Sequence, residues 1–536
     1  MTQFIQQESS DMVGLFNNSK ARVLVVVFLL SGLLFSASAA RAGDIYLAQN
    51  SVGAGNGGDC GDALPYSWFN SSSNWGNGAN QIGPGTIVHL CGKISGGAGA
   101  TGLTFQGSGT SGNPITLLFE NGADLTSSQW GNAISSSHHD FITIDGGANG
   151  VIENTANGSN LSNHGDSNGI YIVGGNSVEI KNLIIRNIYV HSPGGSDGQN
   201  SAGIRFDEAP LTNVSVHNNT INDARSGIIF GFATINGADV YGNTISNICW
   251  GIPFLDGNTG STATAVKVHD NDIHDFINWW DANFEIHFDG IMFASTNPNT
   301  SFTNSSIYNN YLHGPMDGNG TAYIYLTGSS GGMSGITVYN NLIYSIKPTS
   351  GDTRLPEALI VLGFHSQSAV INNTLISVNP GIKIRDGGTN VTAIKNNIFS
   401  GSSEGAMYCA IVNQTETSLA GMNNNDYYNL GNLHQWIWGD GRIYYNSLAS
   451  WRSGCNCDSN SIVGDPKLDA NFHPQSGSAA IGLGTSLAGT AIAALGLDKD
   501  QNTRPNGGPW DNGVYQSGIT ATKAPAAPSG LKAQVQ

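Results

Sequence analysis

Charged residues are scarce in this chain, and basic residues are the scarcer kind. Only 11% of its 536 residues are charged, with 21 Lys and Arg against 38 Asp and Glu, so the formal net charge is −17. Such an acidic field repels a phosphate backbone, and we therefore expect no nucleic-acid partner. The same field disfavours a polyanionic substrate, except where a local basic groove overrides the net charge.

Long apolar runs are also rare. The run over residues 23–34 is shorter than the roughly 20 residues that a membrane span needs. It follows Lys20 and Arg22 and precedes an Ala-Arg-Ala segment at 40–42 that supplies small residues for cleavage, which is the layout of a secretory signal peptide. We predict that residues 1–42 are a signal peptide and that the mature protein is secreted, extracellular or periplasmic, without membrane contact. A membrane anchor is the alternative.

Cysteine is limited to six residues. In an exported protein these residues face an oxidising compartment, and we predict a disulfide between Cys60 and Cys91 in the amino-terminal region. The other four are Cys249, Cys409, Cys455 and Cys457, and the sequence does not determine their pairing. A metal site through Cys455 and Cys457 has no second cluster of ligands to support it.

Glycine is abundant, with 72 residues, and a recurring phrase runs through the chain. An alternating apolar stretch ends in Asn and continues with Ile or Leu. The Asn positions are Asn219, Asn243, Asn271, Asn310, Asn341, Asn373 and Asn396. A second phrase, Gly followed by Ile, alternates with the first at Gly169, Gly203, Gly227, Gly251, Gly290 and Gly381. Periods of about 20 to 50 residues indicate a solenoid, propeller or array, and the short strands favour a β-solenoid.

The repeated Asn residues predict an internal ladder. Each solenoid turn adds strands about 4.8 Å above the last, so an Asn at one offset can hydrogen-bond to its copies above and below. We predict that Asn310 and Asn341 are buried neighbours in adjacent turns.

These phrases resemble the repeats of right-handed parallel β-helix proteins, the superfamily of secreted pectate-lyase-like enzymes. The segments 44–47 and 84–90 look like the opening strand and first turn of such proteins, and 504–515 is similar to their closing segment. The resemblance implies an all-β fold, a single right-handed parallel β-helix with an amino-terminal cap and a carboxy-terminal closing segment. The expected divisions are 43–165 (cap and first turns), 166–415 (regular β-helix), 416–518 (last turns and closing segment) and 519–536 (a Pro/Ala linker and the start of a fibronectin type III-like strand).

The resemblance also implies activity on extracellular polysaccharide. In a β-helix, side chains at one offset in successive turns form columns, so carboxylates one or two turns apart are about 5 or 10 Å apart. These separations bracket the two carboxylate geometries of glycosidases.

The longest interval between Asn phrases holds the candidate site. Trp279 and Trp280 suit a stacking platform for sugar rings, or alternatively cover the core beneath a long loop. Glu285, His287 and Asp289 alternate and so point to one side of a strand, where crowded carboxylates raise one another's pKa and favour a general acid. The alternative for Asp289 is that it closes a turn.

Counting turns onward from Asp289 leads to Thr321 and then to Glu357. We predict that Asp289 and Glu357 share one column two turns apart, as an inverting pair with a water between them. A slip of one residue in this count would send the side chain to the other face. Trp250 and Arg354 are further substrate-binding candidates.

The preferred function is a monomeric glycoside hydrolase, and two alternatives stay open. A polysaccharide lyase or uronate epimerase would use a base such as His287, a cation such as Arg354 and often Ca²⁺. The turn 317–320 could hold Ca²⁺ but is also ordinary turn chemistry, and we expect no required cofactor. The other alternative is a non-catalytic surface or adhesion solenoid.

Overall fold

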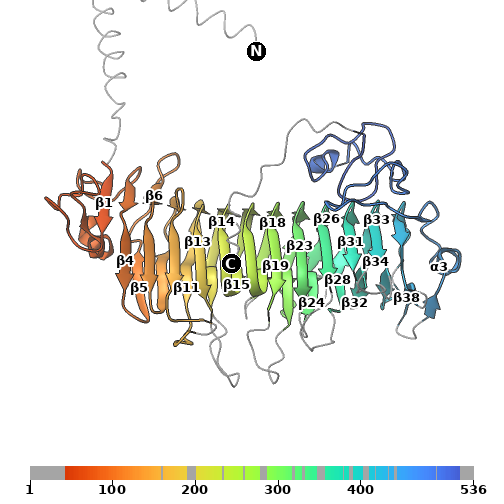
Figure 1. Cartoon of the computed structure of the whole chain (residues 1–536), viewed down its shortest axis with the longest axis horizontal. Helices are drawn as coiled ribbons and strands as arrows, with labels where there is room; N and C mark the ends of the chain where they lie inside the picture. Colours follow the sequence, from red (N-terminus) through yellow and green to blue (C-terminus); the bar gives the residue numbers. More distant parts are fainter. Residues whose placement is uncertain are drawn as a thin grey trace, which may run out of the picture.

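The protein is one elongated coil of short strands (Figure 1). The computed structural model describes residues 43–158, 161–189, 201–231, 234–256, 260–277, 287–316, 320–328, 332–346, 356–377, 380–385, 390–401, 410–416, 418–431, 434–439, 443–490 and 492–518. The predicted parallel β-helix is confirmed, because successive turns pair their strands in parallel, with the right-handed crossover usual for such connections. None of the helices in these ranges is long and apolar enough to cross a membrane.

The first stack of strands leads into the Asn positions. Its members are β1 (Ile45–Ala48), β3 (Ile87–Leu90), β6 (Ile115–Phe119), β9 (Ile142–Asp145), β12 (Val178–Lys181), the second half of β14 (Ala202–His217), β16 (Ile235–Tyr241), β18 (Thr262–His269), β22 (Ser306–Tyr308), β26 (Thr337–Tyr339), β30 (Ser368–Ile371), β33 (Val391–Lys395) and β36 (Met422–Asn423). Short strands extend this stack: β2 (Leu64–Pro65), β21 (Ser301–Thr303), β25 (Met333–Ser334) and β29 (His365–Ser366).

The second stack follows the Asn positions. It contains β4 (Lys93–Gly96), β7 (Asp124–Ser127), β10 (Val151–Asn154), β13 (Ile184–Ile188), the first halves of β15 (Thr220–Gly231) and β17 (Thr244–Leu255), β19 (Asp272–Phe276), β23 (Tyr311–Met316), β27 (Leu342–Ile346), β31 (Thr374–Ser377), β34 (Ile398–Gly401), β37 (Asp426–Tyr428) and β40 (Ile462–Val463).

The third stack carries the Gly-Ile phrase. It contains β5 (Ala100–Thr104), β8 (Trp130–Ser137), β11 (Asn168–Asn176), the first half of β14, the second halves of β15 and β17, β20 (Phe288–Ala294), β24 (Gly320–Thr327), β28 (Ala358–Gly363), β32 (Ile382–Arg385), β35 (Ile411–Asn413) and β38 (Trp436–Trp438). The last strand pairs antiparallel with β39 (Ile443–Tyr445).

Columns of identical apolar side chains fill the interior. Ile252, Ile291, Ile324 and Ile360 are aligned in successive turns of the third stack, and each is fully buried. Burying one such side chain contributes about 1.5 to 3 kcal/mol. The regular core therefore follows from the repetition of Ile at one offset of successive turns.

The predicted Asn ladder is confirmed. Asn310 and Asn341 are both fully buried, and Nδ2 of Asn310 donates to Oδ1 of Asn341 at 2.9 Å. The same side-chain bond joins the members in order: Asn219, Asn243, Asn271, Asn310, Asn341, Asn373, Asn397 and Asn425.

One position in the predicted ladder is wrong, because the ladder passes through Asn397 and not Asn396. Asn396 has a φ of 57°, and the preceding residues Asn309, Asn340 and Asn372 of other turns share this left-handed conformation. Asn tolerates it because its short polar side chain can hydrogen-bond locally. In each Asn-Asn pair the first residue therefore turns the corner and the second enters the ladder.

The amino-terminal cap is closed by the predicted disulfide, since Cys60 and Cys91 are bonded with their Cα atoms 5.6 Å apart. The cap also contains two short 3-10 helices, η1 (Tyr66–Asn70) and η2 (Ser72–Asn74). At the other end, Cys455 and Cys457 form a second disulfide beside α3 (Leu448–Cys455), a pairing that the sequence left open. Cys249 is buried in the core, and Cys409 lies outside the described residues.

The closing segment does not continue the coil but folds back along it (Figure 1). This segment, which includes η3 (Ala493–Gly496), lies over the first stack near β26 and β33. Nη2 of the buried Arg504 donates to Oδ1 of Asn340 at 3.1 Å, and Oγ1 of Thr374 accepts from the Val514 N–H at 3.1 Å. Nδ2 of two further corner residues, Asn372 and Asn396, donates to backbone oxygens of the same segment, which thus caps the corners of several turns.

Candidate functional site

Asp289 lies at the start of β20, on the outer side of the coil. In the next two turns the residues at its offset, Ala322 and Ala358, lie outside the main core, in a separate small cluster with Val361 and Tyr325. Asp289 is aligned with Trp250 in the preceding turn and with Ala322 in the following one. The strand therefore directs Asp289 away from the apolar interior.

The predicted column of Asp289 and Glu357 is wrong by one residue. Asp289 pairs with Ala322, and Ala322 pairs with Ala358, so the column position two turns on is occupied by alanine. A register shift between Phe288 and Asp289 adds one residue to the β24 side, because Phe288 pairs with Gly320. Glu357 immediately precedes the column position.

Asp289 and His287 form a close pair. Nδ1 of His287 lies 2.5 Å from Oδ2 of Asp289, and Oδ1 of Asp289 accepts a hydrogen bond from the Ala322 N–H at 3.1 Å. The Asp289 side chain is 0% exposed, whereas that of His287 is 45% exposed. Both carboxylate oxygens are therefore engaged, and only the histidine presents a surface to an incoming molecule.

Burial and mutual attraction shift the pKa values of this pair. Burial raises the pKa of Asp289 to about 6, against the lowering effect of its hydrogen bond with His287. Burial alone would lower the pKa of His287, but its hydrogen bond to Asp289 and the charge of that carboxylate raise it above the ordinary value. Such paired shifts are typical of groups that exchange protons.

The exposure of this pair differs from that of other histidine–carboxylate contacts. Across the described residues, the carboxylates that meet His89, His217, His269, His274, His313 and His473 are 21% to 49% exposed. Asp289 alone in this set is fully buried beneath an accessible ring. A carboxylate in that position fixes the tautomer and orientation of the histidine.

Trp250 and Arg225 complete one side of this pair. Nε1 of Trp250 donates to the backbone oxygen of His287 at 2.7 Å. The guanidinium carbon of Arg225 lies 4.2 Å from the centre of the Trp250 ring. Burial lowers the pKa of Arg225 to about 10, and the side chain is nearly inaccessible. On the other side, the Tyr325 ring lies 5.7 Å from the ring of His287.

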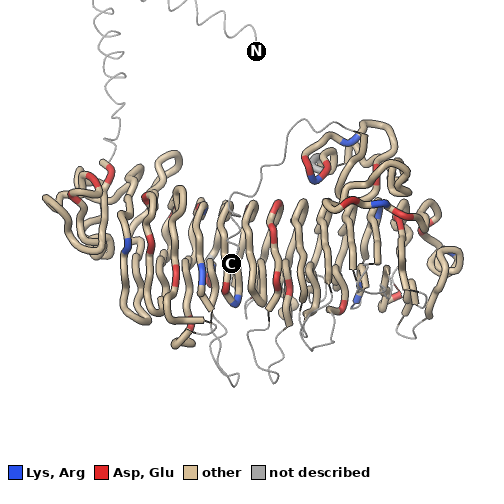
Figure 2. The backbone as a smooth tube through the Cα atoms, viewed as in Figure 1, with Lys and Arg blue, Asp and Glu red and all other residues tan. Residues whose placement is uncertain are grey.

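Glu357 lies close enough for its negative charge to raise the pKa values of both Asp289 and His287. The carboxylate, 37% exposed, forms an ion pair with Nζ of Lys383 at 2.8 Å, and Nη1 of Arg385 lies 3.4 Å away. Elsewhere in the described coil, Figure 2 shows basic residues scattered singly among acidic ones. A carboxylate and two cations thus lie near the histidine pair.

Several predicted residues lie outside the described part of the chain: Trp279, Trp280, Glu285, Arg354 and residues 317–319 of the possible Ca²⁺ turn. Sequence reasoning did not find Arg225, Tyr325 or the pairing of Glu357 with Lys383. The register of the third stack could have related Tyr325 to Lys383, since Tyr325 pairs with Val361 and Val361 pairs with Lys383.

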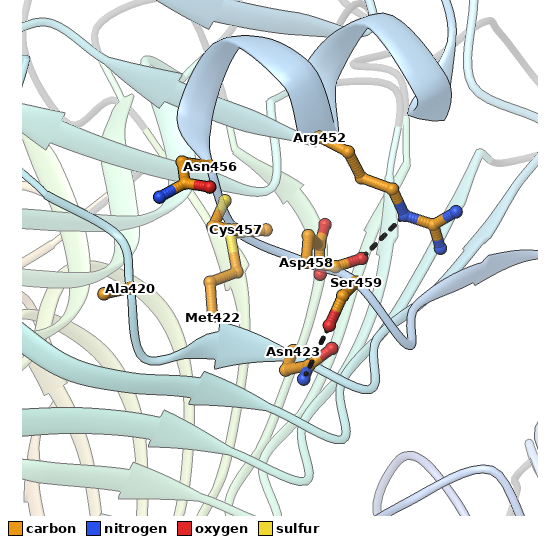
Figure 3. Close-up of a pocket in the computed structure, with 8 residues that line it drawn as sticks. All are labelled: Ala420, Met422, Asn423, Arg452, Asn456, Cys457, Asp458 and Ser459. Atoms are coloured by element: carbon orange, nitrogen blue, oxygen red, sulfur yellow. Dashed lines mark hydrogen bonds between the residues drawn. The ribbon is translucent and has the colours of Figure 1, made fainter.

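A cavity of about 410 Å³ lies elsewhere, at the end of the coil beside α3 (Figure 3). Its basic residue, Arg452, donates through Nε to the backbone oxygen of Asp458 at 2.8 Å, and its Nη2 donates to that of Ser461. The Asp458 carboxylate in turn accepts from Tyr427 at 2.6 Å and Trp451 at 3.2 Å. The polar groups of this cavity therefore hold the carboxy-terminal turns together.

Known structures that are similar to this chain include a lacto-N-biosidase, a pectate lyase and a protein in complex with xylose. The GH136 lacto-N-biosidase from Eubacterium ramulus is 14% identical over 74% of this chain and 71% of its own, with a TM-score of 0.46. XylC in complex with xylose is 10% identical over 88% and 98%, with a TM-score of 0.49. Pectate lyase Pel9A is 14% identical over 89% and 98%, with a TM-score of 0.40. No family model and no curated protein sequence matches the chain. Likeness at this level does not identify an activity, and the parallel β-helix itself is established by the strand pairing of the chain.

Proposed function

We propose that this protein is a secreted enzyme that cleaves polysaccharide, with His287 as the group that transfers a proton. One observation supports this proposal above the others: a fully buried Asp289 holds the accessible His287 through a 2.5 Å contact. The buried carboxylate keeps the proton on Nδ1 and leaves Nε2 to act on a substrate. Asp289 is then a positioning residue rather than the direct acid of the sequence prediction.

The finer proposal is a glycoside hydrolase that uses Glu357 as the second group. Protonated His287 gives its proton to the glycosidic oxygen as the bond from that oxygen to the anomeric carbon breaks. Glu357 accepts a proton from water, whose oxygen forms the new bond to the same carbon. His287 and Glu357 immediately precede β20 and β28, which are two turns apart, about 10 Å along the axis, near the upper end of the spacing in inverting enzymes.

A lyase is the second candidate, and the cations beside Glu357 favour it. Lys383 and Arg385 could bind a uronate carboxylate while His287 removes the neighbouring carbon-bound proton. Elimination then forms a carbon–carbon double bond and breaks the bond to the leaving oxygen, which takes up a proton, so that no water is consumed overall. The two reactions differ in their products, because only elimination gives unsaturated sugars that absorb in the ultraviolet.

The test is a panel of neutral and uronic polysaccharides, with reducing ends and ultraviolet absorbance followed separately. On any substrate found, His287→Asn is expected to lower turnover about 100-fold or more. Asp289→Asn should lower kcat and change the pH profile, as expected for a residue that sets the ionisation of His287. The matched control is Asp239→Asn, which makes the same change in the His269 pair, whose carboxylate is 40% exposed, and should retain activity. Full activity of both site variants would place the catalytic centre elsewhere, and no product across the panel would contradict the proposed function.

A further inference from the structure

A second cluster of titratable side chains lies on the adjoining second stack, away from the His287 pair. Asp272 and His274 are on β19, two residues apart and so on one face of the strand, and His313 is on β23 in the next turn. One ligand atom from each of the three lies within 4.8 Å of the other two. This arrangement uses residues for which the proposed polysaccharide cleavage has no role.

We propose that Asp272, His274 and His313 form a binding site for one divalent transition-metal ion of the zinc type. Two imidazoles and a carboxylate are ligands that suit Zn²⁺, Ni²⁺ and Cu²⁺, whereas Ca²⁺ and Mg²⁺ prefer oxygen ligands alone. The side chains are 40%, 23% and 25% exposed, in the order given, so an ion can reach them from solvent. Three protein ligands would leave a position for water.

The separations are close to those that a tetrahedral ion requires. Zinc lies about 2.0 to 2.2 Å from nitrogen and oxygen ligands, which places neighbouring ligand atoms roughly 3.4 Å apart. Nε2 of His313 and Oδ1 of Asp272 are 2.9 Å apart, and the largest separation in the cluster is below 4.8 Å. The 2.9 Å separation and the 4.8 Å limit lie on either side of the value that a tetrahedral ion requires.

The backbone aligns the two histidines before any ion arrives. His274 pairs with His313 across β19 and β23, and their rings are stacked with centres 4.8 Å apart. The ring of Tyr311 stacks on His313 at 4.0 Å and limits its rotation. Little conformational freedom is therefore lost when the imidazoles bind.

Asp275 supplies the outer contact that histidine ligands commonly have. Its Oδ2 lies 2.8 Å from Nδ1 of His274. A proton held on Nδ1 by this carboxylate leaves the lone pair on Nε2, the tautomer that binds metal, and such carboxylate–histidine contacts orient the ring and strengthen the ligand. This contact is independent of the three proposed ligands.

The neighbouring His269 also contacts carboxylates, but the rings stacked on it are not imidazoles. Nδ1 of His269 meets Asp270 at 2.6 Å and Nε2 meets Asp239 at 2.8 Å. Both nitrogens of that single imidazole are occupied by carboxylates, and the rings stacked on it belong to Tyr241 and Tyr308. His269 is therefore the matched control for a surface histidine with acidic neighbours.

The experiment is a titration of the purified full-length protein, free of a polyhistidine tag, with ZnCl₂ at pH 7.5 by isothermal calorimetry. We expect saturable binding of one ion per chain. His274→Ala and His313→Ala should each weaken it by about 100-fold or more, and Asp275→Asn by about 10-fold to 100-fold, as for other outer-contact residues. His269→Ala should leave it unchanged. Zn²⁺ should also raise the Tm of the unaltered protein, and Ca²⁺ should not.

Two results would overturn the proposal. One is the absence of saturable zinc binding in the unaltered protein. The other is one-to-one binding of unchanged affinity in folded His274→Ala and His313→Ala, with folding checked by circular dichroism. If an alanine variant does not fold, His313→Gln replaces it, because glutamine can keep a hydrogen bond to Asp272; retained zinc affinity in that variant also contradicts the site. The titration needs no substrate, so its outcome is separate from that of the proposed polysaccharide cleavage.

Discussion

The Asn ladder makes one residue of the core unusually sensitive to a single-atom change. Asn310→Asp replaces the Nδ2 amide by an oxygen of nearly the same size. In the protein this amide donates to the Val268 backbone oxygen at 2.9 Å and to Oδ1 of Asn341 at 2.9 Å. The opposite contacts, from the backbone N–H and Nδ2 of Asn271 to Oδ1 of Asn310, survive the substitution.

The cost follows from the lost side-chain donor. Oδ1 of Asn341 still accepts from the backbone N–H of Asn310 at 3.1 Å, so the Val268 backbone oxygen is the acceptor that loses its Asn310 partner. Removing such a partner from a buried group costs about 1 to 3 kcal/mol, and the negative charge of the introduced carboxylate adds to this cost. Against a typical total of about 5 to 15 kcal/mol, this is a large part of the free energy of unfolding. The new oxygen also faces two oxygens, which raises the pKa of the introduced carboxyl.

The raised pKa gives the prediction a pH signature. When the introduced carboxyl holds a proton it can donate one hydrogen bond, so the variant then recovers part of its stability. Because the folded pKa is above the unfolded value of about 3.9, the penalty should grow as pH rises from about 4 through the folded pKa. Thermal unfolding followed by circular dichroism at pH 5 and pH 8 measures it.

The matched control is Asn299→Asp, an exposed position where the same change should alter the free energy of unfolding by no more than about 0.5 kcal/mol. If Asn310→Asp at pH 8 is as stable as this control, the ladder does not support the fold in the way described.

The fold could be predicted because its determinants repeat. The Asn phrase recurs turn after turn and the Gly-Ile phrase recurs in many of them, so the parallel coil and the burial of Asn310 followed from periodicity alone. The one error, Asn396 for Asn397, arose in an Asn-Asn pair whose members have different roles. Only the regular offset in the other turns distinguishes the corner residue from the ladder residue.

The candidate site depended on register, which the sequence left uncertain. Alternation placed His287 and Asp289 on one side of a strand, and the structure brings them into contact. The count of turns from Asp289 reached Glu357 rather than Ala358 because the turns at Ile324 and Ile360 lack the Gly-Ile phrase that marks the offset elsewhere. His274 and His313 had a signal that was overlooked, since each stands three residues after a ladder Asn and so occupies the same offset in adjacent turns.

Two buried groups give further pH predictions. Burial lowers the pKa of His365 to about 4, so the folded protein excludes a proton that the unfolded chain binds below about 6.5. Stability should fall as pH decreases from about 6.5 to about 4, and His365→Gln should reduce this loss of Tm; an unchanged slope would contradict it. Burial raises the pKa of Asp426 to about 7, so the fold retains a proton that the unfolded chain releases above about 3.9. Stability should then fall as pH rises from about 4 to about 7. Asp426→Asn, which cannot ionise, should match the unaltered protein in Tm near pH 4 and exceed it at pH 8, by the equivalent of up to about 4 kcal/mol. Equal Tm values at pH 8 would show that the carboxylate is accommodated without cost.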